Sequence, residues 1–432
     1  MSDIFWRQLK RIVPARWQWV LDHEGFRRYF ANTGWLFVGQ LVILFLSFLV
    51  GAWVARHLGP EKYGALNYAL SLAGIFGFLA ALGVDNVLAR DLVKYPDKRP
   101  MLLGTALVVK GIGGGLAFVA SMVLAFVMDT TPLVRLLVAV YALSYIFQPF
   151  GLLSSFFQAK VEAKYNAKAQ IAASIISSIL KVAWIFSGLG VVWLITIYML
   201  DAVLNILFLW LIYWGNKESA KGWRFDSKLF KYLLSSGWPL LLSGAASFLL
   251  FKIDQVMIGK MLGETQVGLY AAAAKVSEVW YFIPGILCAS FFPAIVNAKN
   301  VSEDLYRGRL KNFYLLMASL ALLIIIFILV FSKLLVLYLF GFEYLASIPV
   351  LRIHIFSALG MFMGFAVSQY LLAENREKDV FRGNFLAVAI NVALNFWLIP
   401  LIGIRGAAIA TLVAYSVLPL YVFLVIKIKS HS

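Results

Sequence analysis

Apolar runs of about 20 residues recur along the chain, and they constrain the fold more than any other feature. A helix needs about 20 mostly apolar residues to cross the roughly 30 Å hydrocarbon layer of a bilayer. The breaks between the runs are short and contain charged residues, glycine or proline, while 62% of all residues are hydrophobic and 14% are charged. Runs of this length without alternation favour helices over barrel strands. The sequence therefore predicts an all-α polytopic membrane protein.

The runs predict twelve transmembrane helices. One further apolar stretch, 331–345, is too short to cross and is expected to form an interfacial turn. The expected cores are 34–55, 65–88, 102–127, 133–157, 169–188, 191–213, 233–258, 267–292, 312–331, 346–372, 384–401 and 405–427.

Lysine and arginine alternate between the connections, which predicts the orientation. The segment before the first run is basic, and so is every second connection after it, whereas the connections in between hold few cations. By the positive-inside rule, both termini are expected to be cytoplasmic. This topology accounts for most of the formal charge of +17, so the charge does not call for a nucleic-acid partner.

A short motif occurs twice and predicts an internal repeat. "LGPEKYG" at 58–64 and "LGETQVG" at 262–268 are both Leu-Gly-x4-Gly. Their offset of six spans fits two six-helix bundles related by a parallel repeat, as in many secondary transporters. The hairpins at 176–200 and 390–414 also resemble each other. The motif glycines Gly59, Gly64, Gly263 and Gly268 are expected to end one helix and start the next.

These boundaries divide the chain into four parts. A basic segment at 215–232 contains aromatic residues and is expected to be an amphipathic linker on the cytoplasmic surface. The expected parts are a cytoplasmic basic N-terminal arm at 1–31, a first six-helix bundle at 32–214, this linker at 215–232, and a second six-helix bundle with a short basic tail at 233–432.

Most signals of enzymes and pumps are missing from the sequence. It has one cysteine and four scattered histidines, which excludes a thiolate metal cluster or an HExxH site. "KGIGGG" at 110–115 lies inside an apolar run, where glycine favours close helix packing over phosphate binding. No cofactor is implied. A membrane transferase, polymerase or ligase would typically need a large outward loop, so the sequence favours a secondary transporter and not an enzyme.

Three stretches resemble a known family. They are "FANTGWLFVGQLV…ARHLGPEKYGALNYALSLAGIFGFLAALGVDNVLARDL", "KIDQVMIGKMLGETQVGLYAAAAKVSEVWYFIP" and "NVALNFWLIPLIGIRGAAIATLVAY". In order and spacing they resemble Wzx-type polysaccharide flippases of the multidrug/oligosaccharidyl-lipid/polysaccharide exporter superfamily, over roughly 32–427. The resemblance implies translocation of an undecaprenyl-pyrophosphate-linked oligosaccharide, such as an O-antigen or exopolysaccharide repeat unit, to the outer leaflet of a bacterial cytoplasmic membrane by alternating access.

Two related functions stay open beside this one. A cation-coupled multidrug exporter of the same superfamily should carry surplus acids in its cavity and need no lipid carrier. A peptidoglycan lipid precursor flippase is closer in chemistry, although the relatives that we would compare have two more C-terminal spans. The expected partners are the lipid-linked oligosaccharide, membrane lipids, a coupling H+ or Na+, and other polysaccharide-assembly membrane proteins.

Ionisable residues inside the spans are the candidate site, because such groups are unfavourable in a bilayer and usually face a cavity or a partner. Cations exceed anions among them, which suits a substrate with a diphosphate. The ten residues are Asp85, Lys110, Arg135, Lys181, Asp201, Lys252, Asp254, Lys275, Glu278 and Arg352.

Lys275 is the first candidate for binding phosphate, because the matching span of related flippases carries a basic cavity residue. The alternative is a structural pair with Glu278 at i+3. Arg56 occupies a position that is likewise basic in the family, but it could instead be an interface anchor. The remaining candidate cations for substrate binding are Lys110, Lys181, Lys252 and Arg352.

The four acids are the candidates for proton or sodium coupling, because burial can raise the pKa of a carboxylate. They are Asp85, Asp201, Asp254 and Glu278. Asp85 is also expected to join Arg90 and Asp91 in an inner gate of ion pairs. On the eleventh span Asn384, Asn391 and Asn395 share a helix face, which could line a sugar-permissive lumen or bond helices together.

Overall fold

The computed structural model describes residues 24–429, and these residues form helices and connecting turns without a strand. The predicted N-terminal arm therefore lies outside the described residues as far as residue 23. The helices of the first half, called the N-lobe below, are α3 (Glu24–Gly74), α4 (Gly77–Ala81), α5 (Val84–Lys94), α6 (Arg99–Val127), α7 (Pro132–Ala142), α8 (Ser144–Phe147), α9 (Leu153–Ala159), α10 (Ala163–Ser187) and α11 (Val191–Gly215), with 3-10 turns at Pro96–Lys98 and Gln148–Leu152.

The second half, called the C-lobe, begins inside the predicted linker. Residues 216–226 form turns, and the first helix of the C-lobe starts at Ser227. The helices of this lobe are α12 (Ser227–Leu262), α13 (Glu264–Glu278), α14 (Phe282–Lys299), α15 (Glu303–Leu339), α16 (Ile348–His354), α17 (Ser357–Ala373), α18 (Glu377–Ile402) and α19 (Ile404–Lys429), with 3-10 turns η4 (Val279–Tyr281) and η5 (Phe342–Ser347).

The described residues contain nine helical segments that are long and apolar enough to cross a membrane, or eleven if two bent pairs each count as a span. The chain is thus a multi-pass membrane protein, but the predicted number of twelve is not reached. The difference lies in the second predicted span, 65–88. The first part of this predicted span belongs to α3. The rest is divided into α4 and α5 by two breaks, one at Phe76 and one at Leu82 and Gly83. Leu82 and Gly83 both have positive φ.

The interfacial turn predicted at 331–345 is wrong over most of its length. Helix α15 continues without interruption to Leu339, because neither glycine nor proline breaks the apolar run before Gly341. Gly341 has φ of 94° and ends this helical course. The short 3-10 turn η5 follows it.

The connections lie on two faces of the molecule. The turns at 160–162, 216–226, 300–302 and 374–376 form the basic face, and those at 128–131, 263 and 340–347 form the opposite face. Contacts agree with this division: Arg224 N donates to Pro100 O on the basic face, and Thr131 Oγ1 donates to Glu264 Oε1 at 2.7 Å on the opposite face. The loops that the sequence places on one side therefore meet each other.

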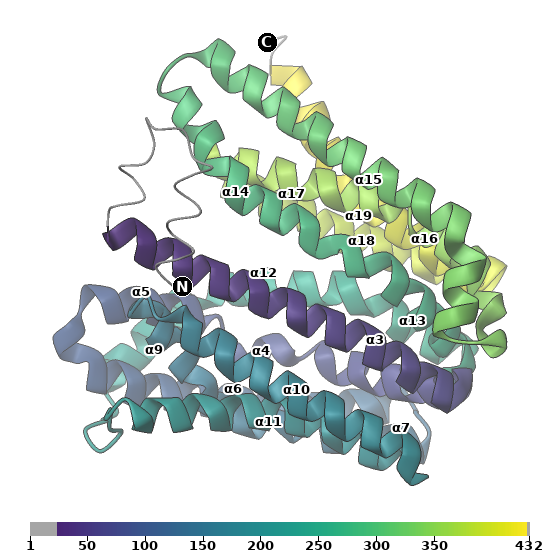
Figure 1. Cartoon of the computed structure of the whole chain (residues 1–432), viewed down its shortest axis with the longest axis horizontal. Coiled ribbons are helices and arrows are strands. Elements are labelled where there is room, and N and C mark those ends of the chain that lie inside the picture. The colour runs from purple at the N-terminus through teal and green to yellow at the C-terminus, as the bar shows by residue number, and fades with distance from the viewer. Residues whose placement is uncertain (1–23, 430–432) are drawn as a thin grey trace, which may run out of the picture.

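The two lobes meet on the opposite face and, apart from α12, diverge toward the basic face. Figure 1 shows α14 and α15 above and α6, α10 and α11 below, with the lobes joined where α13 contacts α3. Within the described residues α14, α17, α18 and α19 make at most marginal contact with the N-lobe. Hydrogen bonds from Tyr344 to Ala55 O and from Lys260 to Met128 O add to the junction on the opposite face.

Helix α12 contacts the N-lobe along its basic-face half. A Cβ on Gly83 would lie 2.2 Å from Gly237 O, so the two backbones touch. Arg90 Nη2 donates to the Tyr232 hydroxyl at 2.9 Å near the same end. Close to its other end, α12 packs beside α13 and α18 in the C-lobe. One helix therefore belongs to both lobes.

The repeated Leu-Gly-x4-Gly motifs touch each other on the opposite face. A Cβ on Gly64 would lie 1.7 Å from Glu264 O, and a Cβ on Gly268 would lie 1.9 Å from Pro60 O, so the contact is reciprocal. Gly59 and Gly263 have φ of 72° and 87° and stand at helix junctions, as predicted. The prediction is wrong for Gly64 and Gly268. They lie inside helices, where a missing side chain lets two backbones approach.

Candidate functional site

Lys275 points from α13 toward α3 in the middle of the molecule. A Cβ on Gly51 of α3 would lie 1.8 Å from Lys275 Nζ, so the ammonium group occupies the space left by a missing side chain. Within the described residues Lys275 makes no ion pair with Glu278 or with any other acid. The structural pair with Glu278 considered from the sequence is therefore not formed, and the ammonium group is not neutralised by a contact.

Two further lysines lie near Lys275. The charges of Lys181 on α10 and Lys252 on α12 both act on Lys275. Lys181 Nζ lies 4.0 Å from the centroid of the Tyr198 ring, and the charge of Asp201 on α11 acts on Lys181. A cation over an aromatic face is stabilised by the ring without losing its charge. These three lysines come from both lobes.

Two acids border the lysines. The charge of Lys181 acts on Asp201, and the charges of Lys252 and Asp254 act on Glu278. Together Lys181, Asp201, Lys252, Lys275 and Glu278 form what we call the central charge cluster. It holds three lysines and two acids, so basic side chains outnumber acidic ones in this cluster.

A second polar site lies inside the C-lobe around Asp254, which is 3% exposed. The Tyr270 hydroxyl donates to Asp254 Oδ2 at 2.8 Å, and Asn395 Nδ2 donates to Oδ1 at 2.5 Å. Thr411 Oγ1 also donates to Oδ2. Asn395 donates in addition to Asn391 Oδ1. Three helices, α13, α18 and α19, thus supply the buried carboxylate of α12 with hydroxyl and amide partners, and the set is called the Asp254 site below.

The Asp254 site has no countercharge in contact with it. Within the described residues no lysine or arginine forms an ion pair with Asp254, and no group of three or more histidine, cysteine or acidic side chains could hold a metal ion. One carboxylate among neutral oxygens suits a proton or a monovalent cation, because a buried charge needs hydrogen bonds or a partner. The sequence indicates Asp254 and the asparagine stripe but gives no signal for Tyr270 and Thr411.

His354 extends this network and was not selected from the sequence. It is fully buried at the break between α16 and α17, and its ring packs edge-on against Tyr270 with the centroids 5.7 Å apart. Its Nδ1 lies 2.9 Å from Ser277 Oγ, while Nε2 has no hydrogen-bond partner among the described residues. A lone histidine in an apolar run gives no sequence signal, because only the fold brings it to Tyr270.

Lys110 and Asp85 form a separate pair inside the N-lobe. Lys110 Nζ lies 2.6 Å from Asp85 Oδ1, and the lysine side chain is 4% exposed. Ser155 Oγ donates to Asp85 O at 3.1 Å. The structure thus places these two candidates, one for binding and one for coupling, against each other and away from the central charge cluster.

The candidate arginines also lie outside the central charge cluster. Arg56 is exposed on the opposite face and donates to Tyr338 O at 3.3 Å, which fits the anchor alternative. Arg352 Nε donates to Ser332 Oγ at 3.0 Å. Arg90 pairs with Asp91 and reaches Tyr232 on α12, so it bridges the lobes at the basic face. Asp85 pairs with Lys110 instead of joining Arg90.

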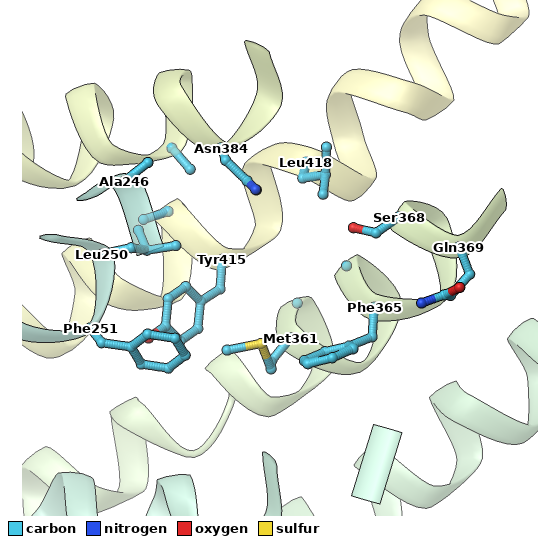
Figure 2. Close-up of a pocket in the computed structure, with 14 residues that line it drawn as sticks. Ala246, Leu250, Phe251, Met361, Phe365, Ser368, Gln369, Asn384, Tyr415 and Leu418 are labelled. Atoms are coloured by element: carbon cyan, nitrogen blue, oxygen red, sulfur yellow. The ribbon is translucent and has the colours of Figure 1, made fainter. Parts of the chain in front are cut away.

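A cavity of about 270 Å³ lies beside the Asp254 site, between α12, α17, α18 and α19. Phe251, Met361, Phe365 and Tyr415 form one side of it, and Asn384 and Ser368 point into it from opposite helices (Figure 2). No charged side chain lines it. A neighbouring cavity of about 240 Å³ between α14 and α17 shares Phe365 and Gln369. We call the first cavity the C-lobe pocket.

Comparison with protein families and curated proteins gives a consistent result. Residues 29–299 match the family described as polysaccharide biosynthesis protein. A Shigella flexneri protein named as an O-antigen transporter is 23% identical over 406 residues, which cover 88% of this chain and 93% of the relative. Lsg locus protein 1 of Haemophilus influenzae is 26% identical over 299 residues, or 65% of this chain and 70% of the relative.

Solved structures share the fold. An inward-facing multidrug resistance MATE family transporter of the MOP superfamily superposes with a TM-score of 0.74 at 18% identity, covering 89% of this chain and 93% of that one. The lipid II flippase MurJ in an inward closed conformation gives a TM-score of 0.67 at 15% identity, covering 92% of this chain and 87% of that one. At these identities the likeness shows the fold alone.

Proposed function

Because the chain belongs to the family of polysaccharide biosynthesis proteins, we propose that it is a flippase for an undecaprenyl-pyrophosphate-linked oligosaccharide repeat unit. It moves this lipid from the inner to the outer leaflet of a bacterial cytoplasmic membrane. The O-antigen transporter name of the Shigella relative and the fold shared with a lipid flippase support this substrate class. Other polysaccharide-assembly membrane proteins would supply and consume the lipid.

The observation that carries the proposal is the uncompensated Lys275 ammonium group between the lobes. A lipid-linked diphosphate bears about two negative charges, and cations held inside a membrane protein in a region shielded from water attract them strongly. Lys181 and Lys252 extend the basic region, and the missing side chain of Gly51 lets the Lys275 ammonium group reach α3. The central charge cluster therefore binds the diphosphate, while the polyprenyl chain stays in the bilayer.

Alternating access follows from how the lobes meet. The opposite face is closed by the backbone contact of Gly64 with Gly268, whereas the lobes diverge toward the basic face, which carries both ends of the described chain (Figure 1). With the basic face in the cytoplasm, this conformation receives substrate from the inner leaflet. Release requires the motif contact to open and the basic-face ends of the lobes to approach.

Coupling to an ion is assigned to Asp254. Its carboxylate is buried without a countercharge, so the site becomes more stable when it takes up a proton or a sodium ion. Tyr270 and Thr411 approach the same oxygen, and Asn395 approaches the other. Because α12, α13, α18 and α19 all contribute, a change in the charge of Asp254 changes how these four helices pack.

Flipping of a fluorescent undecaprenyl-pyrophosphate oligosaccharide in proteoliposomes tests the function. The parent should flip the lipid, and Lys275→Ala should reduce the rate at least about tenfold, since a charged hydrogen bond contributes about 1.5–3 kcal/mol. Lys311→Ala is the matched control, because this exposed lysine lies at the basic-face end of α15. A Lys275→Ala variant as fast as the control would contradict the assignment of the phosphate site. A folded parent that flips none of the lipid would contradict the function.

A further inference from the structure

The C-lobe pocket combines aromatic rings with neutral hydrogen-bonding groups. Phe251, Phe365 and Tyr415 present ring faces or edges to it, and Ser368, Gln369 and Asn384 stand around it (Figure 2). None of these three polar side chains makes a hydrogen bond to another described residue. Their donors and acceptors are therefore available to a molecule in the pocket.

The lining argues against the charged and the lipid parts of the substrate. A diphosphate would find no cation there, because no charged side chain lines the pocket. A polyprenyl chain would press hydrocarbon against two amides and a hydroxyl and leave them unpaired, which is unfavourable. A neutral sugar fits both halves of the lining, because its C–H faces pack on aromatic rings and its hydroxyls bond to amides.

The position of the pocket agrees with this ligand. Phe251 in its wall is followed in the chain by Lys252 of the central charge cluster, and the charges of Glu278 and Asp254 act on Tyr415 at its floor. Asn384 lies seven residues into α18, or about 10 Å from its basic-face end. The pocket thus adjoins the part of α12 that carries Lys252, on the side of the lobe from which substrate would arrive.

We propose that the C-lobe pocket binds a neutral sugar unit of the lipid-linked oligosaccharide, held by Asn384 and Gln369 and packed on Phe365. This inference rests on the proposed function, since it takes the glycolipid as substrate. The diphosphate lies on Lys275 and its neighbours, and the adjoining sugar enters the C-lobe. Selection of the glycan then depends on this pocket, while the phosphate cluster treats all lipid diphosphates alike.

Equilibrium binding to the full chain in detergent tests the pocket with two probes, undecaprenyl pyrophosphate without sugar and the same lipid bearing a neutral hexose disaccharide. The parent should bind the glycosylated probe about tenfold more tightly, as expected for two or so added hydrogen bonds. In Asn384→Ala/Gln369→Ala the ratio should fall to about one, with binding of the sugar-free probe unchanged. Lys275→Ala should weaken both probes and keep the ratio.

Asn312→Ala is the matched amide control, because Asn312 lies on α15 in a different cavity. A double variant that keeps the tenfold preference would overturn the pocket assignment, as would a parent that binds the two probes equally. A parent that binds neither probe would instead overturn the proposed function. If the double variant does not fold, Phe365→Leu, which keeps an apolar side chain and removes the ring, must lose most of the preference, or the assignment fails.

Discussion

At the scale of single residues, the position of Lys275 depends on Gly51. The Cβ of Gly51→Ala would occupy the place of Lys275 Nζ, but a flexible lysine tip can move away without disturbing the backbone. We expect the melting temperature to stay nearly constant, while the affinity for undecaprenyl pyrophosphate falls severalfold because the ammonium group is displaced. Gly111→Ala is the control, since its Cβ would meet nothing within 4 Å. Equal affinities of the two variants would show that Lys275 is not held for binding.

Substitution of Thr411, whose hydroxyl group donates to Asp254 from α19, tests the Asp254 site. Thr411→Val keeps the shape of the side chain and removes the hydrogen bond to Asp254, which should lower the free energy of unfolding by about 1–3 kcal/mol. It should also change the sodium or proton dependence of flipping. Thr411→Ser keeps the hydroxyl and should keep the ion dependence. Thermal unfolding and flipping in ion gradients measure both effects, and identical ion dependence in both variants would exclude Thr411 from coupling.

At the scale of elements, the reciprocal glycine contact should control the opposite face. In Gly64→Ala a methyl group would overlap the backbone of Glu264, and a backbone cannot yield as a lysine tip does. The substitution penalises only the conformation in which this face is closed, so the population should shift toward one in which it is open. Spin labels at Lys62→Cys and Thr265→Cys in a Cys288→Ser background should report a longer distance.

Gly74→Ala is the matched control for that experiment, because the added methyl group would meet nothing within 4 Å. Distances that are unchanged in Gly64→Ala and in Gly268→Ala would mean that the motif contact does not set the conformation.

The basic-face ends of α14, α15 and α17 are joined by one carboxylate. Partial burial works to raise the pKa of Glu374, but hydrogen bonds from Lys299 and Tyr306 together hold it below its usual value. Because the folded pKa is lowered, the stabilisation is present above the ordinary pKa of about 4.3 and is lost as the pH falls through the folded value.

Glu374→Gln should therefore lower the free energy of unfolding at pH 7, by less than about 1 kcal/mol for a partly exposed pair. The difference from the parent should shrink as the pH falls below the ordinary pKa of a glutamate and disappear below the lowered folded pKa. Thermal unfolding over a pH series from 7 downward measures this, with exposed Glu377→Gln as the control. A difference that persists unchanged in acid would place the origin of the effect elsewhere.

Local sequence predicts the helices well but not their breaks and partners. Apolar length located most membrane-spanning segments, since a span has to be apolar whatever it packs against. The break at Leu82 and Gly83 depends on packing. Helix α15 continues because its apolar run contains no glycine or proline before Gly341. Within the site, Lys275 could be selected from its place in an apolar run. The sequence could not predict that Asp85 pairs with Lys110 or that Thr411 donates to Asp254. The two members of each pair are far apart in the sequence, and nothing in their spacing indicates contact.

At the scale of the whole molecule, the charge of the proposed substrate would link flipping to the membrane potential. With the cytoplasm negative, moving two negative charges outward is favoured by roughly 4 to 5 kcal/mol at 100 mV. If the lysines of the central charge cluster return without substrate, the cycle exports net negative charge. We expect the flipping rate in proteoliposomes to rise when a potassium diffusion potential makes the side of the basic face negative. A rate that does not change with a clamped potential would show an electroneutral cycle.

The reciprocal contact of Gly64 and Gly268 has the geometry of a two-fold interface, in which each side offers the same pattern to the other. Between two separate molecules, such an interface would form only as often as they meet, so its occupancy would depend on how many copies the membrane holds. Here both sides belong to one chain, and the connection between the lobes sets their effective concentration. Closing this face is therefore a unimolecular event. A cell that makes few copies of the protein closes each of them as readily as a cell that makes many.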